Sequence, residues 1–294
     1  MSSLMIKRVA ASLTRQSLCQ YIPTNTPRVI TCCCTRHYHD TNDTYKYWSF
    51  DNPGLHRKDD TFRTFMKRNL RYQWLAIKDT LAAPNPDMVD EQSRVIWQYE
   101  GPESVNSFLV SSDEVMGGKS KAYVTSSRNN KLLFYGKVDT TVPRDGETER
   151  SGYCYMQLKQ RYGAFNKEYL MDFRKFNKLT LRVRGDGRAY MVNMKPEMYW
   201  SDNKNDLYNY VFYTRGGPYW QDISLPFSKF FLTSGGRLQD RQAPMMMDKV
   251  KWIGIMLGDK VDGEFSLEID NIKVEYDPSH FEEFAYEKYG GFKL

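Results

Sequence analysis

Apolar and polar residues alternate with a period of two along much of the chain. Between residues 95 and 276, short alternating runs are separated by turn residues, as where Leu179, Leu181 and Val183 precede Gly185-Asp186-Gly187. Such a run is typical of a strand with one side buried and the other in contact with water. Because roughly ten runs follow one another without a long helical pattern, we predict an antiparallel β-sandwich.

Two local features add detail to this prediction. The apolar series Phe265, Leu267 and Ile269 changes parity at Asp270-Asn271, which indicates an inserted residue, or β-bulge. The tripeptide Arg184-Gly185-Asp186 directly follows a strand pattern. We interpret it as a hairpin turn and not as a cell-adhesion motif, because Gly and Asp favour tight turns.

Residues 57–81 follow a different period, with apolar residues at steps of three and four and Lys or Arg on the other face. This pattern predicts an amphipathic helix of about six or seven turns. Asp59, Asp60 and Thr61 suit its start, and Ala83-Pro84-Asn85-Pro86 ends it. Such a helix usually packs against its own domain, and the alternative is docking to a partner. Its apolar positions are Phe62, Phe65, Met66, Leu70, Trp74, Ile77 and Leu81.

The amino-terminal 39 residues contain five basic residues and no acidic residue. This composition is typical of a mitochondrial presequence, and the alternative is a disordered basic tail. Arg36-His37-Tyr38 looks like a matrix-peptidase site, so we expect a presequence at 1–38 and a mature start near His39. A spacer at 39–94, a β-domain at 95–276 and a carboxy-terminal tail at 277–294 then follow.

Outside this leader the charges nearly balance, because 37 of the 42 basic residues remain against 36 acidic ones. A nucleic-acid partner would need a basic face on the folded domain and is therefore not expected. No run approaches the ~18 apolar residues of a membrane-spanning helix, so any membrane association would be peripheral.

Histidine is absent from residues 95–276, and Cys154 is the only cysteine beyond the leader. This composition excludes a Ser-His-Asp or Cys-His catalytic set in the β-domain, and it also excludes the histidine ligands of a zinc or iron site. We therefore expect no catalytic residue, no metal and no cofactor.

The segment Gly117-Gly118-Lys119-Ser120 is similar to part of a phosphate-binding loop, but it fails the pattern. The position that requires the first glycine is Asp113, and a strand pattern follows where a helix is needed. Asp113 and Glu114 are adjacent, whereas a glycosidase carboxylate pair faces across a substrate. We predict a turn in which Asp113 accepts backbone hydrogens and both glycines have positive φ.

Several motifs in order along the chain resemble the complex I intermediate-associated protein family. They are Ser112 to Ser120, Gly136 with Val138, Gly152-Tyr153, Leu181 to Gly187, Ile253-Gly254-Ile255 and Phe265 to Ile272. The resemblance implies a galactose-binding-like jelly roll that acts as an assembly factor for mitochondrial NADH:ubiquinone oxidoreductase. It further implies complex I intermediates, an acyl-CoA-dehydrogenase-like protein and an adaptor protein as partners, in the matrix and peripheral to the inner membrane.

Candidate interaction residues follow from the motif and from the polar side of the next strand pattern. Two other function classes stay open: a carbohydrate-binding module of jelly-roll type, and an enzyme that uses carboxylates alone. A mitochondrial location argues against the first, and the missing histidines argue against most enzymes. The candidates are Asp113, Glu114, Met116, Gly117, Gly118, Ser120, Tyr153 and Tyr155.

Overall fold

The computed structural model describes residues 60–82, 92–144, 148, 151–197 and 205–286. All of them lie within one compact unit, Asp40–Leu294. The predicted presequence and its cleavage site near His39 lie outside these residues. No helix among the described residues is both long enough and apolar enough to cross a bilayer.

One layer of the sandwich is a six-stranded antiparallel sheet with the order β3-β4-β13-β6-β9, in which β1 also pairs with β13. The long strand β13 pairs first with β4 and then with β1, and it pairs with β6 over its second half. The strands are β1 (Ser93–Gln98), β3 (Lys121–Ser126), β4 (Leu132–Val138), β6 (Lys178–Arg184), β9 (Gln221–Pro226) and β13 (Gly263–Glu275).

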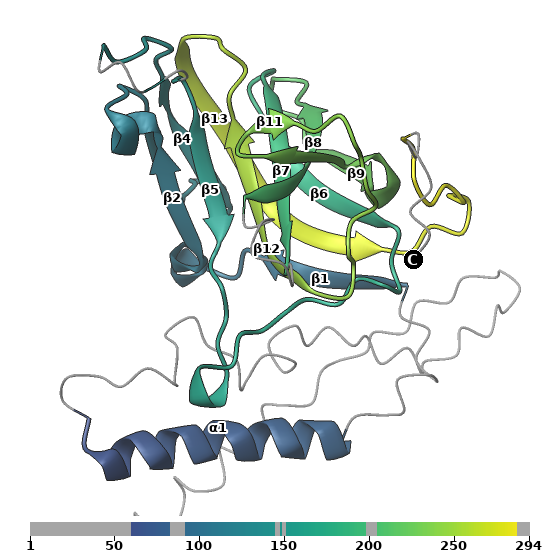
Figure 1. Cartoon of the computed structure of the whole chain (residues 1–294). Coiled ribbons are helices and arrows are strands. Elements are labelled where there is room, and N and C mark those ends of the chain that lie inside the picture. The colour runs from purple at the N-terminus through teal and green to yellow at the C-terminus, as the bar shows by residue number, and fades with distance from the viewer. Residues whose placement is uncertain (1–59, 83–91, 145–147, 149–150, 198–204, 287–294) are drawn as a thin grey trace, which may run out of the picture. The chain divides into compact units, whose positions relative to one another are not determined.

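The second layer is a seven-stranded antiparallel sheet with the order β11-β10-β8-β7-β12-β5-β2. The chain crosses repeatedly between the two layers, for example from β2 to β3, from β4 to β5 and from β6 to β7 (Figure 1). The strands are β2 (Phe108–Ser112), β5 (Cys154–Leu158), β7 (Ala189–Pro196), β8 (Asp206–Tyr213), β10 (Phe231–Ser234), β11 (Arg237–Leu238) and β12 (Val250–Leu257).

Such crossing is typical of a jelly roll, and the predicted antiparallel jelly-roll sandwich is confirmed. The alternating positions point into the core between the layers as predicted. Short 3₁₀ helices connect some strands: η2 (Pro102–Ser107), η3 (Asp113–Met116), η4 (Ala164–Asn166) and η6 (Phe227–Lys229). Fully or almost fully buried core residues include Leu132, Phe134, Cys154, Met156, Leu179, Leu181, Val183, Ile253, Ile255, Leu267 and Ile269.

The predicted β-bulge in the last strand is confirmed. The register between β13 and β6 shifts between Ile269 and Asn271, and the buried side resumes at Ile272 and Val274. The extra residue lets one continuous strand keep both of its halves packed against the same core.

The predicted hairpin at Arg184-Gly185-Asp186 is wrong, because β6 and β7 belong to different sheets. The Asp186 carboxylate accepts hydrogen bonds from the backbone N–H of Ser266 at 2.9 Å and of Arg188 at 3.1 Å. The turn is therefore a crossover between layers that its acidic side chain holds in place. A period of two identifies the buried side of a strand but not the sheet to which the next strand belongs.

Helix α1 (Phe62–Ala82) confirms the predicted amphipathic segment, although it begins later than residue 57. Thr61 precedes the helix, and its hydroxyl accepts a hydrogen bond from the N–H of Thr64 at 3.4 Å. The expectation that the apolar stripe packs on its own domain is wrong, because most of that stripe is exposed. The fully buried side chain of this helix is instead the polar Asn69, which lies beside the stripe.

The thiol of Cys154 provides a test of the core. Its burial, with a smaller contribution from the nearby Asp113 carboxylate, raises its pKa to about 12. At about pH 8.5, an unfolded cysteine is half ionised, whereas the folded Cys154 thiol is protonated and enclosed. We expect peptide mapping to show Cys154 unmodified by iodoacetamide in the native protein and alkylated in urea. Rapid native alkylation at Cys154 would contradict this packing.

Candidate functional site

The turn from Asp113 to Ser120 connects the edges of the two layers. It leaves β2, an edge strand of the seven-stranded sheet, and enters β3, an edge strand of the six-stranded sheet. Among the described strands, β2 pairs only with β5 and β3 only with β4. The turn therefore lies at an open side of the sandwich, where two unpaired strand edges meet.

The Asp113 carboxylate is the structural centre of this turn, and only 1% of the residue is exposed. Its Oδ1 accepts the backbone N–H of Ser120 at 2.9 Å. Its Oδ2 accepts the Ser120 hydroxyl at 3.0 Å and the backbone N–H of Gly152 at 2.6 Å. The prediction that Asp113 accepts backbone hydrogens is confirmed. One side chain thus joins η3, the residue before β3 and the segment before β5.

Ser120 extends this network to the end of β4. Its buried hydroxyl accepts the backbone N–H of Asp139 at 3.0 Å and lies 3.2 Å from the Asp139 carbonyl. Asp113 also bonds through its own backbone, since its N–H donates to the Tyr153 carbonyl at 3.2 Å and its carbonyl accepts from Gly118 at 2.9 Å. The turn is consequently fixed to strands of both layers.

Gly117 and Gly118 are required for two different physical reasons. Gly117 has φ of 82°, in the left-handed region that favours glycine, as predicted. Gly118 does not have positive φ, so that part of the prediction is wrong. A Cβ atom at Gly118 would lie 2.5 Å from Oδ1 of Asp113, and no side chain fits against the buried carboxylate.

The outer surface of the turn is hollowed, and exposed apolar side chains lie there among polar ones. An open hollow of about 330 Å³ lies between β2, η3 and β3. Val110, Val115 and Tyr123 line it and are exposed, and Met116 beside them is half exposed. Exposed apolar side chains gathered in this way mark interaction surfaces more often than isolated ones do. We call Val110, Val115, Met116 and Tyr123 the turn patch.

Tyr153 belongs to the same site, because its hydroxyl donates to the sulfur of Met116 at 3.3 Å. Partial burial, followed by the proximity of Asp113, raises the pKa of Tyr153, so its hydroxyl stays protonated as a donor. Glu114 lines the hollow and is exposed. It does not face the enclosed Asp113 as the second member of a carboxylate pair would.

Tyr155 lies on the outer face of the seven-stranded sheet, paired in register with Ser111 of β2. Its ring is 6.2 Å from that of Trp252, edge to face, and its hydroxyl donates to Gln157 at 3.0 Å. Burial raises its pKa, and it is not the exposed residue that the alternation predicts. The structure therefore brings seven of the eight candidates together at the turn, whereas the side chain of Tyr155 packs against Trp252 and contributes nothing to the Asp113 network.

Sequence reasoning missed Val110, Val115, Tyr123 and Gly152 at this site. Val115 lies inside the motif, and its position as an apolar residue at the tip of a predicted turn could have indicated that it is exposed. Val110 and Tyr123 are adjacent only because β2 and β3 are the edges of facing sheets, which no local pattern shows.

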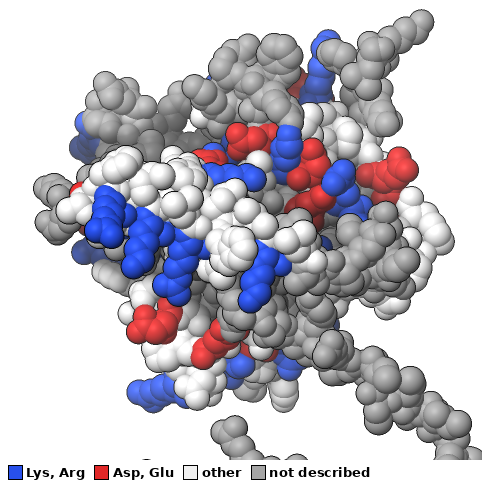
Figure 2. All heavy atoms as spheres, turned by 90° about the horizontal axis from the view of Figure 1, so that it is seen from below, with Lys and Arg blue, Asp and Glu red and all other residues white. Residues whose placement is uncertain are grey.

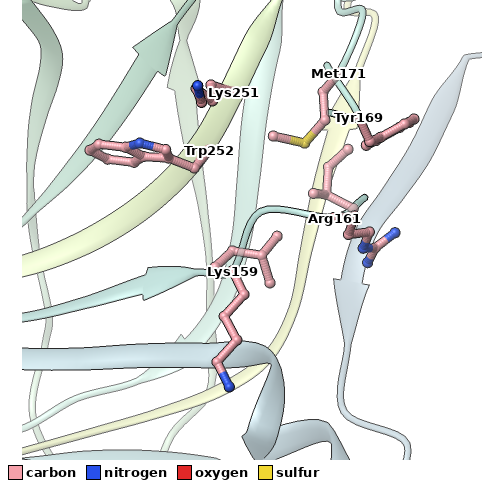
Figure 3. Close-up of a pocket in the computed structure, with 8 residues that line it drawn as sticks. Lys159, Arg161, Tyr169, Met171, Lys251 and Trp252 are labelled. Atoms are coloured by element: carbon pink, nitrogen blue, oxygen red, sulfur yellow. The ribbon is translucent and has the colours of Figure 1, made fainter. Parts of the chain in front are cut away.

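A second cavity lies under the outer face near Trp252 and holds only about 10 Å³, room for about one water molecule. Lys251 on its wall is paired with Glu168 at 2.7 Å. Figure 3 shows Lys159 extending away from both Lys251 and Trp252. This cavity is too small for a substrate. Among the described residues, no group of His, Cys, Asp and Glu is arranged to hold a metal ion.

The two glycines give a comparison within one turn. Gly117→Ala forces an alanine into positive φ and should cost about 1 kcal/mol of stability. Gly118→Ala should cost about 3 kcal/mol, since it overpacks the site and displaces a buried acceptor. Thermal and urea unfolding of both variants checks the order. A Gly118→Ala variant as stable as the wild type would contradict the geometry.

Replacement of the central carboxylate tests the network directly. In Asp113→Asn, an amide NH₂ faces N–H donors from Ser120 or Gly152, so we expect about 2 kcal/mol of destabilisation. The matched control is the exposed neighbour, Glu114→Gln, which should stay within ~0.5 kcal/mol of wild type. Urea unfolding measures both, and equal effects in the two variants would refute the central role of Asp113.

Comparison with known proteins places this motif in a family. Residues 97–269 match the family model described as "Complex I intermediate-associated protein 30 (CIA30)". The Mus musculus protein "Complex I intermediate-associated protein 30, mitochondrial" is 46% identical over 205 residues, which are 69% of this chain and 62% of that protein. The Drosophila melanogaster protein of the same name is 42% identical over 201 residues, covering 67% of this chain and 68% of that protein.

The solved structures that match this chain share less of its sequence than these relatives do. A family 11 carbohydrate-binding module from Clostridium thermocellum has a TM-score of 0.43 and 18% identity, covering 63% of this chain and 95% of that chain. The matched segment spans less than two thirds of the mouse relative, whereas the family model covers more than half of this chain. On this basis the chain belongs to the complex I intermediate-associated protein 30 family.

Proposed function

We propose that this chain binds intermediates of respiratory complex I as an assembly factor and catalyses no reaction of its own. The observation that carries the proposal is the turn patch, an exposed apolar surface built on the motif of the family. The mouse and fly relatives are named for association with complex I intermediates, which supports the same class of partner here.

The turn patch has the physical character of a binding surface. Val115 is 82% exposed, yet the backbone under it is fixed by Asp113, Ser120 and Gly152. Binding through a preformed turn costs little conformational entropy, so more of the contact energy appears as affinity. Most of the binding energy of an interface usually comes from a few large anchor residues surrounded by polar ones. Here the polar residues beside the apolar side chains are Glu114 and Lys121.

The chemistry of the β-domain supports binding over turnover. Cys154, the only cysteine beyond residue 34, is buried with a pKa of about 12 and cannot supply a thiolate at neutral pH. The Asp113 oxygens are occupied by three hydrogen bonds from the protein itself. Asp113 is therefore not available as the second carboxylate that Glu114 would need for the two-carboxylate chemistry of glycosidases.

The proposed location is the mitochondrial matrix, at the surface of the inner membrane. The acid-free basic leader at residues 1–39 supports import, and the relatives are named mitochondrial. In this proposal the protein works beside an acyl-CoA-dehydrogenase-like protein and an adaptor protein.

Cells that lack the protein, re-expressing defined variants, test the proposal. The variant Val115→Asp with Met116→Asp places charges on the turn patch. The matched control, Tyr219→Asp with Leu238→Asp, changes two apolar residues that are exposed elsewhere. Native gels should show complex I restored by wild type and control. Cells with the patch variant should lack complex I and accumulate membrane-arm subassemblies, while the other respiratory complexes persist.

Two results would contradict the proposal in different ways. A normal amount of complex I in cells that lack the protein would exclude the assembly role. Full rescue by the patch variant, at wild-type protein levels, would show that binding does not use the turn patch.

A further inference from the structure

Helix α1 presents a band of large apolar side chains that its own domain leaves uncovered. Projected at about 100° per residue, this band occupies an arc of about 120°. Trp74, at the edge of the band next to Lys67 and Lys78, is 66% exposed. An exposed apolar face of this size marks an interaction surface. The exposed residues of the band are Phe62, Leu70, Trp74, Ile77 and Leu81.

The helix is attached through a different side. Asn69 has no exposed surface; its Oδ1 accepts the N–H of Phe165 at 2.7 Å, and its amide donates to the Phe65 carbonyl at 3.0 Å. Phe165 and Asn166 adopt left-handed backbone conformations, with φ of 54° and 61°, which residues other than glycine rarely do. The contact between α1 and η4 is therefore formed by Asn69 and the backbone of Phe165, and it leaves the apolar band of the helix exposed.

A row of basic side chains follows one edge of the apolar band. Arg63, Lys67, Arg71 and Lys78 are exposed, and none of the four side chains forms an ion pair among the described residues. Figure 2 shows Lys and Arg side chains in a row beside uncharged surface. The whole helix contains five basic residues and a single acidic one, so this surface is complementary to a negatively charged partner.

We propose that α1 lies flat on an anionic phospholipid membrane, with its apolar band in the boundary between head groups and acyl chains. Tryptophan and aliphatic residues favour that depth. The adjoining Lys and Arg side chains reach the phosphate groups from the same face, because their long stems can extend along the apolar surface. The helix, about 30 Å long, is not a bilayer-spanning element.

A lipid surface fits this helix better than a groove in another protein. The apolar band and the basic row are neighbours around the helix and extend together from Phe62 to Leu81. A planar anionic surface contacts both along their whole length at once. A protein groove would need an apolar floor and one acidic wall of the same length. The inference refines the membrane location in the proposed function, but vesicle binding needs no complex I, so each can fail independently.

Flotation with lipid vesicles tests the inference on the protein in the form recovered from mitochondria. The vesicles contain phosphatidylcholine alone or phosphatidylcholine mixed with phosphatidylglycerol. Wild type should float with the mixed vesicles and much less with the neutral ones. Lys67→Glu with Arg71→Glu, and separately Trp74→Ser with Ile77→Ser, should each lower the partition coefficient at least about tenfold.

The matched controls change the same kinds of residue on the sandwich. Arg215→Glu with Lys229→Glu reverses two exposed charges, and Tyr219→Ser with Leu238→Ser removes two exposed apolar side chains. Both controls should bind like wild type, and circular dichroism should show every variant folded. Wild type that stays unbound to the mixed vesicles, or α1 variants that float like wild type, would overturn the proposal and assign the band to a protein groove.

Discussion

The carboxylate of Asp113 accepts three hydrogen bonds, two from Ser120 and one from Gly152, and these two residues lie in different parts of the sandwich. Through Ser120 and Gly152 it fixes the start of β3 and the segment before β5, and Ser120 continues the network to Asp139 at the end of β4. A buried carboxylate without such donors would be costly. The requirement to satisfy it therefore holds the edges of both sheets in one arrangement and presents Val115 and Met116 outward.

This constraint explains why the segment from Asp113 to Ser120 both stabilises the fold and is a candidate binding site. Gly118 is needed because the carboxylate lies against it, and Gly117 because the chain must turn through a left-handed conformation. Asp113 and Ser120 therefore hold the backbone in place, and Val115 and Met116 between them are available to contact a partner. The tip residues contribute little to the fold, so recognition can depend on them without a loss of stability.

Much of the fold could be predicted from the sequence, because a period of two marks the buried side of strands such as β5. A change of parity likewise marked the bulge after Ile269. Other features depend on contacts between distant segments. The crossover at Asp186 was predicted as a hairpin, since alternation does not identify the sheet of the next strand. The apolar side of α1 was expected to be buried, but the helix is attached through Asn69. The residues around the hollow come together only when two sheet edges meet.

The most direct test of the central claim is site-specific photocrosslinking in mitochondria. A photoreactive amino acid at position Val115, on the turn patch, is compared with one at Leu238, which is 67% exposed on the sandwich. Position 115 should crosslink to subunits of complex I intermediates, and position 238 should not. Crosslinking of complex I subunits with equal yield from both positions, or from position 238 alone, would contradict the central claim.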